Sequence, residues 1–317
     1  MTLQEAKKNI IQKIKASSES PELDADVLLQ ALLKKDKTFV LLNRGYELAA
    51  EQEALLAEWT AARAKGLPVA YITGHKEFYG LDFYVSQSVL IPKPDTEILV
   101  ARAAELLADR IDENFLTPKI SGGGGSNLSV CDMCTGSGCV ALSVLRALID
   151  GERVDLERLP TFVMADISAA ALEVAQKNAR ALLSPDELKK VKFVQSNLFD
   201  NIPFSFDAIL SNPPYIPHDQ ARELLADGRG EPLLALDGDI NEVGDFSGTH
   251  DGLAVFRRLA LEAQRHLNRG GDFLCETGEY NADAAADFLR ANGYVDVGID
   301  LDLEGQKRVV YGVIAAR

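Results

Sequence analysis

The chain has 317 residues, of which 47% are hydrophobic, so it is long enough for one large domain or two with a substantial core. Its formal net charge of −15 disfavours duplex DNA or bulk RNA as a stable partner, because affinity for a phosphate backbone comes from basic residues. No apolar run approaches the roughly 20 residues that span a bilayer, and 1-MTLQEAKKNI-10 has neither the apolar region of a signal peptide nor the Arg/Ser-rich character of a transit peptide. The sequence predicts a soluble, cytoplasmic protein with no membrane partner; an organellar location stays open if a targeting segment has been removed.

The first 75 residues carry helical periodicity, as in 24-DADVLLQALLKK-35, without strand-like alternation, and predict a small domain of four or five helices. From residue 76 the pattern changes to aromatic and β-branched residues around Gly80, which predicts a β-hairpin. The following 92-PKP-94 excludes regular structure. We therefore expect three regions: a helical substrate-binding domain at 1–75, a hairpin and linker at 76–97, and a second domain at 98–317.

Strand-like and helical runs alternate through this second domain. Such alternation is typical of an α/β fold in which helices cover both faces of a Rossmann-like, doubly wound, mostly parallel sheet. Seven strands are expected, at 128–133, 161–166, 191–196, 206–211, 271–277, 294–300 and 308–315. One helix is expected to begin near residue 138, and three more are expected at 168–182, 252–267 and 281–292.

Two segments have the composition of insertions. The 121-SGGGGSNL-128 segment is rich in Gly and Ser, and 237-DGDINEVGDFSGTHDG-252 is polar, acidic and aperiodic. Neither is expected to carry chemistry. The stretch 150–160 is expected only to lengthen a connection from a helix to a strand.

The cysteines do not have the spacing of a disulfide framework, because Cys131, Cys134 and Cys139 are clustered and Cys275 is remote. A reducing compartment is the better fit. Cys131 falls within an apolar run and should be buried, and Cys139 and Cys275 should act as small core hydrophobes. A redox pair or a metal site at 131-CDMC-134 is disfavoured, since no further ligands cluster nearby in the sequence.

A glycine-containing turn follows the first strand of the predicted sheet. Glycine lets the backbone approach a ligand closely, and the start of the next helix supplies free amides. The turn lacks the full G-x-G-x-x-G pattern, so it offers no obvious binding site for the pyrophosphate of a dinucleotide. The turn that is present better suits S-adenosylmethionine, which has no phosphate. The candidate cofactor-binding residues here are Cys134, Thr135, Gly136, Ser137 and Gly138.

Asp166 ends the next predicted strand. In Rossmann-like sheets a carboxylate at this point commonly binds ribose hydroxyls. The alternative is that Asp166 merely caps the helix that begins near Ser168. We favour ribose binding because a glycine turn follows the preceding strand.

The strand at 206–211 ends at 212-NPPY-215. Ligands of open α/β sheets lie beyond the carboxyl ends of the strands, so these residues should share an edge with the glycine turn. Asn212 offers a carbonyl acceptor, and the prolines restrict the direction of the Pro213 carbonyl. A planar nitrogen held between these acceptors can attack a methyl group, while Tyr215 stacks on the planar substrate. The pattern therefore predicts methyl transfer to a planar nitrogen.

Together these features resemble the class I S-adenosylmethionine-dependent methyltransferases, in which (D/N/S)PPY is shared by several groups that methylate planar nitrogen. The finer resemblance is to the release factor glutamine methyltransferases, the PrmC/HemK family, and it covers nearly the whole chain. It rests on an ordered series of segments: 91-IPKPDTEILV-100, 207-DAILSNPPYIP-217, 231-EPLLALDG-238, 251-DGLAVFRRL-259, 270-GGDFLCETG-278 and 303-LEGQKRVVYG-312.

The resemblance implies a five-helix N-terminal domain that engages a class 1 peptide chain release factor. It also implies a catalytic domain that methylates N5 of the glutamine in the factor's Gly-Gly-Gln motif. By the same resemblance, the cofactor is S-adenosylmethionine, bound by residues 134–138 and Asp166, with Asn197 and Leu198 near its adenine. The residues that hold the glutamine amide are Asn212, Pro213, Pro214 and Tyr215, and Asn212 is also expected to contact the cofactor.

The chain departs from the family pattern at several points. Cys134 stands where a glycine usually opens the turn, which would weaken cofactor binding if φ there is positive. Leu198 replaces an aromatic residue of some members.

The segment 92-PKPDTE-97 has two open interpretations. It is either a rigid linker in which Asp95 or Thr96 caps a helix or, by the resemblance alone, a lid over the methyl-transfer site.

Two other functions compete. A methyltransferase for nucleic-acid amino groups, such as adenine N6 or guanine N2, would need a target-recognition domain and a basic surface to flip a base, and this chain has a small helical region and strong acidity instead. A catalytically idle binding module is favoured only by Cys134, and the intact 212-NPPY-215 argues against it.

Overall fold

The computed structural model describes residues 1–116, 128–151, 154–226, 228 and 230–315. The chain divides into two compact units, one formed by Met1–His75 with Glu223–Gly230 and the other by Lys76–Arg222 with Glu231–Arg317. The Gly/Ser-rich segment expected at 121–128 lies outside the described residues except for Leu128, as do two residues of the 150–160 connection. None of the described helices is long and apolar enough to cross a membrane.

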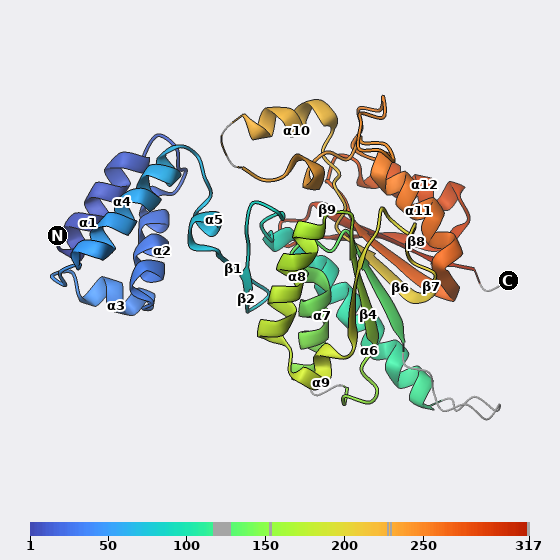
Figure 1. The fold of residues 1–317 in the computed structure, drawn as a ribbon. Coiled ribbons are helices and arrows are strands. Elements are labelled where there is room, and N and C mark those ends of the chain that lie inside the picture. Colours follow the sequence, from blue (N-terminus) through green and yellow to red (C-terminus); the bar gives the residue numbers. More distant parts are fainter. Residues whose placement is uncertain (117–127, 152–153, 227, 229, 316–317) are drawn as a thin grey trace. The chain divides into compact units, whose positions relative to one another are not determined.

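The first unit has five helices within the described residues 1–75, which agrees with the expectation of four or five (Figure 1). Helix α1 begins with a capping box between Thr2 and Glu5, and α3 is capped by Asp36, whose side chain accepts from the Phe39 amide. The apolar faces meet in a small core around Ile10. The helices are α1 Leu3–Ile14, α2 Pro21–Leu33, α3 Lys37–Leu42, α4 Ala50–Ala64 and α5 Val69–Thr73.

The predicted hairpin is confirmed as β1 His75–Phe78 and β2 Leu81–Tyr84. Its two turn residues, Tyr79 and Gly80, have φ values of 52° and 74°, as the favoured two-residue hairpin turns require. A short 3₁₀ helix, η1 Pro94–Thr96, then leads into α6 Glu97–Leu116. The prediction that 92-PKP-94 lacks regular structure is thus wrong for its last residue, because proline is well suited to open a helical turn.

The second unit contains the predicted mixed seven-stranded sheet, with strand order β5-β4-β3-β6-β7-β9-β8. The pairs from β5 to β7 are parallel, and β9 runs antiparallel to both of its neighbours. Strand β7 starts four residues before its expected beginning, and 268–271 form an irregularity where the register with β6 shifts. The strands are β3 Ser129–Met133, β4 Thr161–Asp166, β5 Val191–Gln195, β6 Phe206–Ser211, β7 Leu267–Glu276, β8 Tyr294–Leu301 and β9 Lys307–Ile314.

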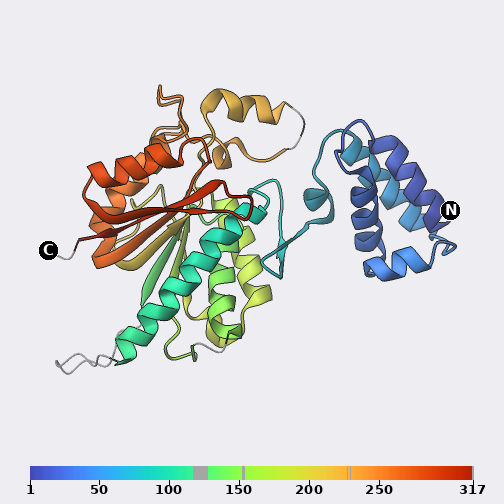
Figure 2. The same ribbon diagram turned by 180° about the vertical axis from the view of Figure 1, so that it is seen from behind.

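Helices cover both faces of this sheet (Figure 2). Helices α6, α7 Cys139–Asp150 and α8 Ala169–Leu182 share one buried cluster with the strands, and α11 Ala254–His266 and α12 Ala282–Ala291 share the other. Burial of each large core side chain contributes roughly 1.5–3 kcal/mol. Three short elements complete the described structure: α9 Pro185–Leu188, α10 His218–Leu225 and η2 Leu233–Ala235.

The strand order creates a switch point at β3, which lies between β4 on one side and β6 on the other. In open α/β sheets the ligand crevice lies at such a point, beyond the carboxyl ends of the strands. The register aligns one row of residues across four neighbouring strands: Ala165, Met133, Ser211 and Cys275. The next residue along each strand therefore reaches the same edge: Asp166, Cys134, Asn212 and Glu276.

Candidate functional site

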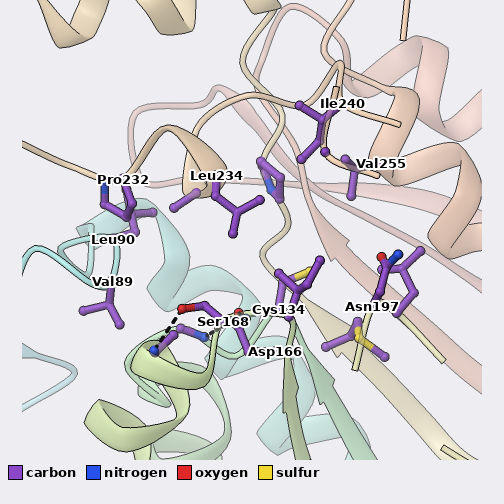
Figure 3. A pocket seen from close by; sticks show the side chains of 18 of the residues that line it. Val89, Leu90, Cys134, Asp166, Ser168, Asn197, Pro232, Leu234, Ile240 and Val255 are labelled. Carbon is purple, nitrogen blue, oxygen red and sulfur yellow. Dashed lines mark hydrogen bonds between the residues drawn. The ribbon is translucent and has the colours of Figure 1, made fainter. Parts of the chain in front are cut away.

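A pocket lies at this carboxyl edge of the sheet and contains about 950 Å³ of atom-free space, part of it open to solvent. Figure 3 shows Asp166 and Ser168 across the pocket from Pro232 and Leu234. Seven of the twelve predicted site residues line it: Cys134, Gly136, Asp166, Asn197, Leu198, Asn212 and Pro214.

The other five predicted site residues are not among the residues that line this pocket: Thr135, Ser137, Gly138, Pro213 and Tyr215. The three in the turn support its shape. The Thr135 hydroxyl donates to Asp132 Oδ2 at 2.6 Å, and the Ser137 carbonyl accepts from Asn178 Nδ2 at 2.8 Å. Gly138 has φ of 82°, and a Cβ there would lie 2.6 Å from Met164 Cε, so only glycine fits without a shift.

The buried Asp132 anchors the turn from below. Its Oδ2 accepts from Thr135 and from the Ala141 amide at 3.2 Å, whereas Oδ1 has no hydrogen-bond partner within the described structure. Burial raises the pKa of Asp132 to about 7, and the hydrogen bonds from Thr135 and Ala141 oppose the rise. Asp132 was not predicted as a site residue, although a carboxylate inside an apolar strand is a visible signal.

Asp166 joins the end of β4 to the glycine turn. One carboxylate oxygen accepts from the Gly136 amide and the other from the Ser168 amide, both at 2.9 Å. The alternative that Asp166 caps the following helix is wrong in its simple form, because Ser168 is the N-cap and its hydroxyl accepts from the Ala171 amide. Burial raises the pKa of Asp166, and the backbone hydrogen bonds lower it.

Cys134 has φ of 60°, a left-handed conformation that favours glycine. This is the condition under which a non-glycine residue was expected to weaken the site. Burial raises the pKa of the Cys134 thiol far above its usual range, so the thiol stays protonated and is not a nucleophile. Cys131 and Cys275 are fully buried as expected, and Cys139 is half-buried against the core. The described residues contain no cluster suited to a metal ion.

We expect Cys134→Gly to be more stable than Cys134→Ala by about 0.5–1 kcal/mol, because both variants lose the thiol and only alanine keeps the left-handed strain. Cys139, the first residue of α7, provides the control. There alanine should be the more stable of the two, since glycine is unfavourable in a helix. Urea unfolding of the four variants measures this. The same order at both positions would contradict the inferred strain.

Asn197 and Leu198 form the wall beyond β5. Asn197 Nδ2 donates to the Glu242 carbonyl at 2.9 Å, and its Oδ1 accepts from Arg258 at 3.3 Å. Leu198 is buried with φ of 46°. Arg258 of α11 lines the same pocket and was not named as a site residue, although it lies within the segment 251-DGLAVFRRL-259.

The acidic segment 237–252 is closer to the site than expected: Ile240, Asn241 and Gly244 line the pocket. Its fold depends on Asp239, which is fully buried and accepts from the Gly252 amide and from the Thr249 hydroxyl. A Cβ on Gly252 would collide with the Tyr215 carbonyl, so this glycine lets the segment lie directly on the NPPY loop.

The NPPY loop is held by hydrogen bonds to several elements. Asn212 Nδ2 donates to Thr96 Oγ1 at 3.0 Å, which leaves Asn212 Oδ1 as the side chain's available acceptor. The Tyr215 hydroxyl donates to Glu276 Oε1 at 3.1 Å, and the Tyr215 carbonyl accepts from Asn281 Nδ2 at 3.1 Å. The expected stacking role of Tyr215 therefore finds no support in the pocket wall, because its hydroxyl is directed to Glu276.

Glu276 and Thr96 are the main residues at this edge that were not named as site residues. Both are only 1% exposed. Burial raises the pKa of Glu276 to about 7, and the neighbouring Thr96, Tyr215 and Arg308 oppose the rise. A signal was present in the sequence, since Glu276 ends an apolar strand as Asp166 does. Only the sheet order shows that β7 is the neighbour of β6.

The raised pKa of Glu276 predicts a pH-dependent stability. Its folded-state pKa of about 7 exceeds the usual value of 4.5, so its contribution is present below pH 4.5 and is lost as pH rises through 7. One such carboxyl accounts for at most about 3 kcal/mol. We expect Glu276→Gln to lose less stability than the wild type between pH 5.5 and 8 in urea unfolding. The exposed Glu279→Gln should follow the wild type, and parallel curves for all three proteins would refute the assignment.

Two family descriptions match the chain: "PrmC N-terminal domain" over residues 5–74 and "Methyltransferase small domain" over residues 100–230. A release factor glutamine methyltransferase of Koribacter versatilis is 33% identical over 316 residues, which cover 98% of each chain. A protein of the same name from Neisseria gonorrhoeae is 37% identical and covers 93% of this chain and 94% of its own.

Among solved structures, the human methyltransferase 10 domain containing protein matches with a TM-score of 0.46 and 16% identity, over 75% of this chain and 90% of that one. The alignments with the two release factor glutamine methyltransferases cover nearly the full length of this chain and of each relative. On this similarity, the chain belongs to the release factor glutamine methyltransferase family.

Proposed function

We propose that this protein transfers a methyl group from S-adenosylmethionine to the side-chain amide nitrogen (N5) of the glutamine in the Gly-Gly-Gln motif of a class 1 peptide chain release factor. The observation that carries the proposal is the orientation of Asn212. The Asn212 side-chain nitrogen is hydrogen-bonded to Thr96, so Asn212 Oδ1 is the available acceptor at the end of β6, beside the pocket. The names of the full-length relatives support the substrate.

The pocket residues fit S-adenosylmethionine by their chemistry. The carboxylate oxygens of Asp166 each accept one backbone amide and have a second lone pair for a ribose hydroxyl. Apolar side chains that include Leu198, Ile240 and Val255 suit the adenine, and the glycine turn gives close backbone approach for the methionine part. We assign cofactor binding to residues 134–138, Asp166, Asn197, Leu198 and Asn212. When bound, the cofactor supplies an electrophilic methyl group on a sulfonium.

The NPPY loop positions the substrate nitrogen and accepts hydrogen bonds from it. As the bond between this nitrogen and the methyl carbon forms, the carbon–sulfur bond of the donor would break, S-adenosylhomocysteine would leave, and one N–H proton would be released to solvent. In the proposed arrangement Asn212 Oδ1 and the Pro213 carbonyl each accept one N–H of the glutamine amide. Their partial negative charges stabilise the positive charge that grows on this nitrogen in the transition state. Holding the nitrogen at near-attack distance supplies a further large part of the acceleration. Tyr215 supports the loop through Glu276 and, with Pro214, completes the proposed substrate site.

The proposal assigns residues 1–75 to recognition of the release factor, 76–97 to the hairpin and linker, and 98–317 to catalysis. A protein substrate agrees with the net charge of −15, which is unfavourable for a stable complex with nucleic acid. Since release factors act on ribosomes, the proposal places the enzyme in the cytoplasm, or in an organelle that has its own translation.

The test is to incubate the protein with labelled S-adenosylmethionine and a purified class 1 release factor, and to locate the label by peptide mass spectrometry. Label on the glutamine of the Gly-Gly-Gln motif is the expected result. A release factor with alanine in place of this glutamine is the matched control and should stay unlabelled. Label that appears only on added DNA or ribosomal RNA, or no label with any substrate, would overturn the proposal.

A further inference from the structure

We propose that Thr96 and Glu276 are positioning residues, which together fix the Asn212 side chain with its oxygen toward the substrate. The inference rests on the proposed methyl transfer to an amide. It assigns a role to a part of 92-PKPDTE-97 that the sequence left open between a linker and a lid. The three residues come from three separate parts of the chain: the turn η1, strand β7 and the loop after β6.

The direction of the hydrogen bonds decides how Asn212 is oriented. Thr96 Oγ1 accepts from Asn212 Nδ2 at 3.0 Å, so the Thr96 hydroxyl hydrogen is available to a second partner. The Glu276 carboxylate lies close enough to Thr96 for this hydroxyl to lower its pKa. An ionised carboxylate only accepts, and the buried Glu276 Oε2 has no hydrogen-bond partner in the described structure, so it can accept from this hydroxyl. In the proposed chain of hydrogen bonds, the Asn212 amide donates to Thr96 and Thr96 donates to Glu276.

This direction matters because one end of an asparagine amide is a hydrogen-bond acceptor and the other is a donor. If Asn212 turned over, its NH₂ group would face the N–H groups of the substrate, and two donors would oppose each other. Loss of one oriented hydrogen bond typically costs about 1–3 kcal/mol, which corresponds to roughly 5- to 150-fold in rate. An orientation error at this single side chain is therefore large enough to control the rate.

The turn that carries Thr96 is itself fixed from several sides. Lys93 pairs with the buried carboxylate of Glu231 at 3.0 Å, and Asp95 pairs with Arg308 at 3.2 Å. Glu97 accepts from the Tyr79 amide of the hairpin at 3.1 Å. Because each polar side chain from 93 to 97 contacts a different element, the segment holds Thr96 at a set position. This favours a fixed positioning role over a mobile lid.

The charge of Glu276 sets the direction of the hydrogen bonds from Asn212 through Thr96 to Glu276. A protonated Glu276 could donate to Thr96, which would then have to direct its own hydroxyl elsewhere. The groups that face Glu276 are Thr96, Tyr215, Arg308 and Asp95. Because the pKa of Glu276 is raised to about 7, the ionised form that the proposal requires is lost as pH falls below 7. The rate at saturating substrates should therefore fall below this pH.

The experiment compares Thr96→Val, which keeps the shape and removes the hydroxyl, with Thr96→Ser, which keeps the hydroxyl. We expect Thr96→Val to lower kcat on the release factor about 10- to 100-fold while the Kd for S-adenosylmethionine, measured by calorimetry, changes less than 2-fold. Thr96→Ser should stay within about 3-fold of the wild type. Thr60→Val removes another buried threonine hydroxyl, which donates to the Leu56 carbonyl at 2.6 Å, and it controls for a general loss of stability.

A second variant, Glu276→Gln, tests the charge. It should lower kcat at pH 8 and abolish the fall in rate below pH 7. Unchanged kcat in Thr96→Val, an equal loss in Thr96→Ser, or a wild-type pH profile in Glu276→Gln would each overturn the positioning role. Wild-type protein is measured in the same assay. If it does not label the release factor, the proposed function fails, whereas labelling at the same rate by wild type and Thr96→Val removes only the positioning role.

Discussion

Replacing Asn212 by alanine should lower kcat for methyl transfer about 100- to 1,000-fold, while the Kd for S-adenosylmethionine changes less than 3-fold because the other residues assigned to the cofactor remain in place. The side chain presents its oxygen at the end of β6, and alanine removes this acceptor together with the bond to Thr96. Loss of one group that stabilises transition-state charge typically has an effect of this size. The backbone should be little disturbed, because the prolines on the carboxyl side still restrict it. Single-turnover rates and calorimetry provide the two numbers.

The matched control for this variant is Asn268→Ala. Asn268 lies near the opposite end of the neighbouring strand β7 and donates to Asp207 at 2.8 Å, so its loss removes a similar amide and hydrogen bond away from the pocket. We expect wild-type kcat for this control. If Asn212→Ala retained turnover within a few-fold of the wild type, the assigned transfer mechanism would be wrong, whatever the cofactor affinity.

The fold could be predicted from the sequence because its signals are local. The run 206–211 is apolar and ends at an asparagine, and 168–182 repeats apolar residues with helical spacing. The helices at 168–182 and 252–267 are found within two residues of their expected ends, as α8 and α11. The start of β7 was missed because the glycines at 270 and 271 and the polar residues before them conceal a strand that is irregular there.

The pocket residues that were predicted share one property: each lies at or just beyond the end of a strand, or in the glycine turn, where a short motif marks it. Thr96 lies in a helical turn instead, and Glu276 ends a strand whose position beside β6 is not visible in the sequence. Thr96 is more than 100 residues from Asn212, and only the tertiary fold brings the two side chains together. Glu276 reaches the site because β7 pairs with β6 in a register that aligns Cys275 with Ser211, and a register is set by pairing rather than by one strand's composition.

The acidic segment 237–252 illustrates a different limit. Its composition gave no periodicity, so it was treated as an insertion without a role, yet three of its residues line the pocket. Its structure comes from single contacts rather than from a pattern: the buried Asp239 accepts backbone amides, and Gly252 allows close approach to Tyr215. Such contacts stabilise irregular loops and leave no periodic trace in a sequence.

Replacing Asp166 by alanine should weaken the binding of S-adenosylmethionine about 100-fold or more. Two hydrogen bonds from ribose hydroxyls to a carboxylate are worth about 1.5–3 kcal/mol each, and the change also frees the Gly136 amide and loosens the turn. Asp207→Ala is the control, because Asp207 likewise accepts a neighbouring strand's amide, that of Ser129 at 2.8 Å, but at the other end of the sheet.

Calorimetric titration separates ribose binding from a purely structural role for Asp166. If its only role were to hold Gly136 and Ser168, then both aspartate variants would lose stability and neither would lose much affinity for the cofactor. The expected outcome is a loss of stability in both and a loss of affinity in Asp166→Ala alone. Since Asn212→Ala is expected to have the opposite effect, a low kcat with intact affinity, the two variants divide this edge of the sheet into a part that binds the cofactor and a part that positions the nitrogen.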